Sequence, residues 1–135
     1  MKRFFLGCLA LVMLTGTGVA SAQSIEKAIK YRQGAFSVMG WHFGAIVDMI
    51  KGKRPFDRED FARRAKIISD VSFIPLEGFV ANSFEGSTKS KVEIWATFSD
   101  FEAKLKQMQE AATHLSTASL SDDYDATKRA AIKLG

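Results

Sequence analysis

The sequence predicts an all-α protein, an antiparallel four-helix bundle with a shortened last helix. Apolar residues recur every three or four positions in four separate segments, which is the period of one helical face. The chain has only two prolines, Pro55 and Pro75, and each follows one of these segments. No long segment alternates apolar and polar residues in the way that a half-buried strand does.

The first 22 residues have the features of a cleavable export signal. Lys2 and Arg3 precede an apolar run over residues 4–14, and the small residues at 20–22 favour cleavage before Gln23. The run is shorter than the roughly 20 residues that cross a bilayer, so no membrane anchor is expected. The sequence therefore predicts a signal peptide at 1–22 and one domain at 23–135.

Composition argues against several classes of function. The net charge is +4, and loss of Lys2 and Arg3 with the signal leaves it near +2. No basic run is interleaved with aromatic residues, so no nucleic-acid partner is expected. Cys8 is the only cysteine and lies in the signal, so the domain offers no thiol for a disulfide or a metal. The sequence has no Gly-rich phosphate loop and no His-Glu-x-x-His motif, and an enzyme is not expected.

The first two predicted helices are separated by a clear stop. The first begins near Ser24, ends before Gly52 and Pro55, and has its apolar stripe at Ile25, Ile29, Phe36, Met39, Phe43, Ile46 and Ile50. The second begins at Asp57, with acidic residues in its first turn, and ends near Pro75. Its inner face is predicted at Phe61, Ala65, Ile68 and Ser72, and its solvated face at Arg58, Arg63, Arg64 and Lys66.

The longest irregular stretch, residues 76–90, follows the second predicted helix and contains two aromatic residues. A loop of this length in a compact domain is more often functional than not. The third helix is predicted from Trp95, Phe98, Phe101, Leu105, Met108, Ala112 and Leu115. A fourth helix follows residues 121–123, with apolar positions at Tyr124, Ala130, Ala131 and Leu134. It is too short to cover its partners, and exposing several large apolar side chains costs about 1.5–3 kcal/mol each. This cost indicates that the chain is a fragment or that something else fills the gap.

Several short motifs resemble the cytochrome c′ family. The first helix contains Tyr31-Arg32-Gln33 and His42-Phe43-Gly44, followed by Lys51-Gly52, and further similarity lies in Phe73-Ile74-Pro75 and in residues 88–95. The resemblance covers nearly all of residues 25–135. It implies a periplasmic four-helix bundle that carries one haem c, transfers electrons to redox partner proteins or binds NO and CO, and often forms homodimers through its first two helices.

The resemblance also implies which residues meet the haem. Arg32 and Gln33 match a pair that contacts a haem propionate, a task for which a guanidinium fork is suited. Phe36 matches the position that covers the distal face of a five-coordinate iron. By the same resemblance Phe79 packs on the porphyrin, and Thr88 and Lys89 lie near a propionate.

The family's Cys-x-x-Cys-His motif, whose cysteines bind haem covalently and whose His ligates the iron, does not occur in residues 1–135. The polypeptide as printed therefore contains neither the thioether cysteines nor the proximal metal ligand. Truncation a few residues before the motif is the preferred interpretation.

Two other hypotheses remain open. One is a haem-free exported helical interaction module. The other is a bundle that holds haem non-covalently, as a b-type cytochrome does, for which Met39, Met108 or His114 would have to ligate the iron. His42 and His114 flank the apolar stripes, so both are expected to be surface or hydrogen-bonded histidines.

Overall fold

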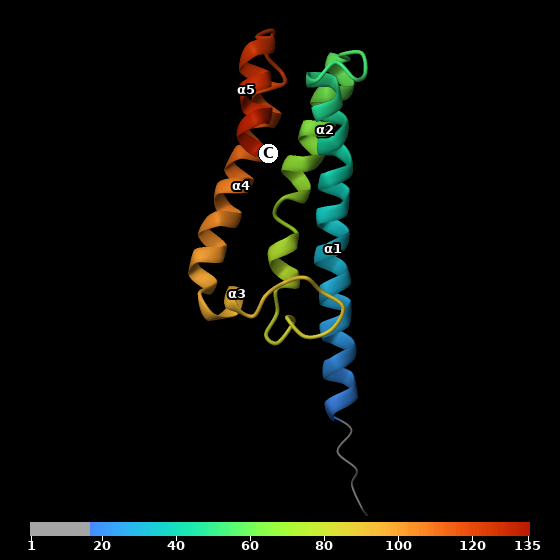
Figure 1. Ribbon diagram of the computed structural model, residues 1–135, viewed down its shortest axis with the longest axis vertical. Helices are drawn as coiled ribbons and strands as arrows, with labels where there is room; N and C mark the ends of the chain where they lie inside the picture. The colour runs from blue at the N-terminus through green and yellow to red at the C-terminus, as the bar shows by residue number, and fades with distance from the viewer. Residues whose placement is uncertain (1–16) are drawn as a thin grey trace, which may run out of the picture.

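The helical periodicity is realised in the computed structural model, which describes residues 17–135. The described elements are α1 (Thr17–Ile50), α2 (Arg58–Val71), the 3₁₀ helix η1 (Pro75–Gly78), α3 (Glu93–Ala96), α4 (Phe98–Ala118) and α5 (Tyr124–Leu134). α1, α2, α4 and α5 run antiparallel in succession, and an irregular loop crosses α1 at one end of the bundle (Figure 1). The all-α fold class is confirmed, and α5, with 11 residues, is much shorter than α1 with 34.

The start of α1 differs from the prediction. Most of the expected signal peptide, residues 1–16, lies outside the described residues, while α1 already begins at Thr17 rather than near Ser24. The chain contains no proline between Thr17 and Pro55 that would stop the helix. In the described part of the chain, no helix is both long enough and apolar enough to span a bilayer.

The turn between α1 and α2 forms where the sequence places it. Gly52 adopts a φ of +68°, which a glycine tolerates without a Cβ clash, and its N–H donates to the Met49 carbonyl at 3.2 Å. Asp57 then caps α2 because its carboxylate accepts the backbone N–H of Asp60 at 2.9 Å. The predicted helix start at Asp57 is confirmed.

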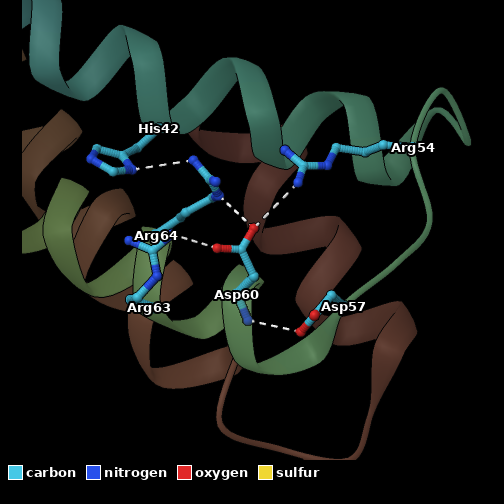
Figure 2. A network of polar contacts seen from close by, with 6 residues as sticks. All are labelled: His42, Arg54, Asp57, Asp60, Arg63 and Arg64. Carbon is cyan, nitrogen blue, oxygen red and sulfur yellow. Dashed lines mark hydrogen bonds and ion pairs between the residues drawn. The ribbon is translucent and has the colours of Figure 1, made fainter.

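A cluster of one carboxylate and three arginines lies where α2 meets the turn and α1 (Figure 2). The Asp60 carboxylate accepts Arg64 Nε at 2.7 Å and Arg63 Nη2 at 2.5 Å, and Arg54 Nη2 lies 3.6 Å away. These partners, above all the hydrogen bond from Arg64, hold the pKa of Asp60 below its ordinary value. Arg64 Nη1 also lies 3.4 Å from His42 Nδ1, and desolvation and then Arg64 lower the pKa of His42. The prediction that Arg64 lies on a solvated face is therefore wrong, because it bridges the two helices.

The core is built from the predicted inner faces. All four residues named for α2 are buried, and on α5 both Ala130 and Ala131 are buried. The central cluster comprises Met39, Ile46, Met49, Phe61, Ala65, Ile68, Ala112, Leu115, Ala130 and Ala131. Tyr124, predicted to face inward, is instead 41% exposed, and its ring packs edge-on against Phe56, which is itself 43% exposed.

The predicted third helix is divided in two. Thr97 has φ −128° and ψ 54°, outside the helical region, so α3 ends at Ala96 and α4 begins at Phe98. The Thr97 hydroxyl donates to the Glu93 carbonyl at 3.2 Å, a local bond of the kind that competes with the helix. Trp95 consequently belongs to α3, and its indole N–H donates to the Val80 carbonyl at 3.0 Å, which ties α3 to the loop.

Candidate functional site

One cavity brings together all six residues that the family resemblance assigns to haem contact. It has a volume of about 440 Å³ and lies between α1, the loop and α3. Its lining comprises Arg32, Gln33, Phe36, Phe79, Thr88, Lys89, Ser90 and Ile94. Ser90 and Ile94 were not marked, although both belong to the motif-bearing run at 88–95. Residues from three segments far apart in the sequence therefore form a single surface.

The cavity depends on a close approach of η1 to α1. A Cβ built on Gly78 would lie 2.7 Å from the Ala28 carbonyl oxygen and 2.7 Å from Arg32 Cβ, so only glycine fits there. This contact places the next residue, Phe79, under the guanidinium of Arg32, whose Cζ lies 4.4 Å from the ring centroid. Arg32 and Phe36 are four residues apart on α1 and so share one face.

Arg32 is the most constrained residue of the cavity, with only 1% of its surface exposed. Its Nη1 donates to the Gly78 carbonyl at 2.7 Å and to Ser83 Oγ at 2.6 Å. Its Nη2 donates to the Ser83 carbonyl at 2.6 Å and to Thr88 Oγ1 at 3.0 Å, with Ser90 Oγ at 3.3 Å. Desolvation lowers the pKa of Arg32, and no carboxylate within residues 17–135 forms an ion pair with it.

The outer edge of the cavity is polar and open to solvent. Gln33 is exposed, and its Nε2 donates a hydrogen bond to the Ser87 carbonyl at 2.9 Å. The amide oxygen of Gln33 takes no part in that bond. Lys89 is exposed, and its side chain forms no hydrogen bond or ion pair with another described residue. Thr88 Oγ1 accepts hydrogen bonds from Arg32 Nη2 and from the Ser90 backbone N–H, the latter at 3.1 Å.

The inner wall of the cavity is apolar. Phe36 is 41% exposed although it lies on the predicted buried stripe, and Phe79 is buried. Behind Phe79 the rings of Phe101 and Trp95 lie with centroids 4.4 and 5.8 Å away, so the wall is supported by an aromatic cluster. An apolar wall beside cationic and amide donors is the surface that a flat, apolar ring system with carboxylate substituents requires.

The residues present fit the face and edge of a haem but supply no axial ligand from this cavity. Met39 is buried in the core, and His42 is held by Arg64. Met108 and His114 line a different cavity, of about 670 Å³, between α4 and α5. No group of three His, Cys, Asp or Glu side chains able to hold a metal occurs in the described residues.

A helical bundle with such a cavity belongs to the class of haem-binding bundle proteins. Residues 27–135 match the family model described as Cytochrome C′, and the chain belongs to the cytochrome c′ family. Haem c is the cofactor of this family.

Individual family members are similar to the chain over most of their length. The chain is 32% identical to the cytochrome c′ of Rubrivivax gelatinosus, over 80% of this chain and 84% of that protein. The chain is 34% identical to the cytochrome c′ of Halomonas halodenitrificans, over 77% of this chain and 83% of that protein. Among solved structures, cytochrome c prime from Shewanella frigidimarina superposes with a TM-score of 0.81 at 39% identity, over 82% of this chain and 87% of that chain.

Proposed function

We propose that the chain holds one haem c in the cavity between α1 and the loop, in the periplasm, and that it transfers electrons or binds small neutral gases rather than turning over a substrate. The observation that carries the proposal is that all six expected haem-contact residues line one cavity. A bound haem would supply the redox-active and gas-binding iron. The residues of this chain would supply the apolar wall, the polar edge and the control of access.

Phe36 is the residue proposed to control access. A phenyl ring has no lone pair to offer a metal, so Phe36 would occupy space beside a bound haem iron without ligating it. The ring would therefore restrict access to the iron to ligands that are small and neutral, such as NO and CO. A structural relative, a variant of cytochrome c prime from Alcaligenes xylosoxidans, is described as a nitric oxide complex.

Replacing Phe36 tests this role. In the haem-loaded protein, Phe36→Ala should increase the rate of CO association, because the ring no longer fills the approach to the iron. Val38→Ala is the matched control, since Val38 is exposed to the same degree, 42%, on the same helix but does not line the cavity. CO association unchanged in Phe36→Ala would show that Phe36 is only a packing residue.

Covalent attachment is proposed to use a Cys-x-x-Cys-His segment that follows Gly135. Within residues 23–135 there is no cysteine to form a thioether bond. Reading the coding frame past Gly135 tests this, and the motif is expected within about a dozen codons. A pyridine haemochrome spectrum of the purified protein separates covalent haem from loosely held b-type haem and from a haem-free interaction module.

A homodimer through α1 and α2, the first two long helices, is also proposed. Trp41 is 78% exposed and borders a groove of about 360 Å³ that is floored by Gly40, Gly44 and Ala45. A two-fold related copy seated on this groove would bury the exposed Trp41 of each chain. Trp41→Ala should shift the sedimentation coefficient to that of a monomer, while Val92→Ala, an exposed residue elsewhere, should not. A monomeric unsubstituted protein would contradict the proposal.

A further inference from the structure

The loop over residues 79–92 has little hydrogen bonding of its own. Its backbone bonds are isolated turns, such as Ser83 N–H to the Val80 carbonyl and Glu85 N–H to the Asn82 carbonyl. Asn82 and Gly86 adopt positive φ values of 61° and 98°, so the chain reverses twice within a few residues. A segment like this is expected to open easily unless another element holds it.

Most of the side-chain hydrogen bonds that hold it come from one residue of α1. The five acceptors of Arg32 belong to Gly78, Ser83, Thr88 and Ser90, so one guanidinium fastens the end of η1 and the middle and later part of the loop. Gln33 and Trp95 add one bond each, to the Ser87 and Val80 carbonyls. Every acceptor is a neutral oxygen. The guanidinium carries separate donors on Nη1 and Nη2, and a lysine ammonium has no equivalent fork.

We infer that Arg32 is a positioning residue that holds the loop closed over the cavity. The inference stands on the hydrogen bonds of the chain alone, because both Nη atoms of Arg32 donate to the loop or to the end of η1.

Hydrogen exchange of the protein without added haem tests this role of Arg32. In Arg32→Lys the amides of Ser83, Glu85 and Thr88 should exchange about 10-fold faster or more, because charge-assisted bonds to the loop are lost. The amides of Leu105 and Leu115 in α4 should keep their protection, which shows that the bundle is intact. Ser83→Ala, which removes one acceptor from the loop side, should produce the same local pattern more weakly.

Two outcomes would overturn this role for Arg32. One is unchanged loop protection in Arg32→Lys. The other is loss of protection in α4 equal to that in the loop, in both Arg32→Lys and Ser83→Ala, which would make these residues general determinants of folding.

Discussion

Gly78 offers a direct test of how tightly η1 packs on α1. In Gly78→Ala the added Cβ would lie 2.7 Å from the Ala28 carbonyl oxygen and 2.7 Å from Arg32 Cβ. Both atoms are fixed by the α1 backbone, so η1 must move away. Overpacking of this kind costs about 1–3 kcal/mol, and the reduced freedom of the unfolded chain offsets about 0.4–1 kcal/mol.

The expected net effect of Gly78→Ala is a loss of about 1–2 kcal/mol of unfolding free energy, or roughly 3–8 °C in Tm for a domain of this size. Thermal unfolding followed by circular dichroism in the far ultraviolet measures it. The φ of Gly78 is not positive, so backbone strain does not contribute.

Gly34→Ala is the matched control. A Cβ at Gly34 meets nothing within 4 Å, and the residue lies in the middle of α1. Alanine there should raise the unfolding free energy by about 0.5–1 kcal/mol. If Gly78→Ala melted at or above the temperature of the unsubstituted chain, the close approach of η1 to α1 would be wrong.

Two further predictions concern the junction of α1 and α2. Asp60→Asn should lower the unfolding free energy at neutral pH by about 1 kcal/mol. Because its partners lower the pKa of Asp60 in the folded state, this stabilisation is present above the ordinary pKa of 3.8 and is lost as the pH falls through the folded-state pKa. Urea unfolding should therefore show a smaller difference in unfolding free energy between Asp60→Asn and the unsubstituted chain below the ordinary pKa than at neutral pH. A difference that stays constant would refute the prediction. Phe61→Ala, at a position 1% exposed, should cost about 3–5 kcal/mol in the same assay, and a loss below about 1 kcal/mol would contradict the central place of Phe61 in the core.

Local signals predicted the parts of the fold that depend on neighbouring residues. The stop at Gly52, the cap at Asp57 and the inner face of α2 each arise from residues within one or two helical turns, so periodicity and capping rules suffice. The division between α3 and α4 was missed because Trp95 has the correct spacing for the α4 seam. Its partner is the Val80 carbonyl, fifteen residues away, and no periodicity reveals such a contact.

The role of Arg32 shows the same limit at the candidate site. The motif marks Arg32 as important, but a sequence does not say whether its hydrogen-bond acceptors come from a ligand or from the chain. The acceptors found in the structure lie 46 to 58 residues away, at the end of η1 and in a loop that has no periodic pattern. Only the folded chain shows that the guanidinium is already engaged.

Charge balance connects this loop to the choice of ligand. The Arg32 guanidinium is buried among neutral oxygens, which offset its desolvation only in part, and Lys89 adds a second positive charge at the open edge. The wall beside them is aromatic and, at Phe36, exposed. A purely apolar ligand would cover the wall but leave both cations without a counter-ion, whereas a small anion would do the reverse. A flat apolar ring with carboxylates on one edge complements both features, and this match supports the proposed haem site.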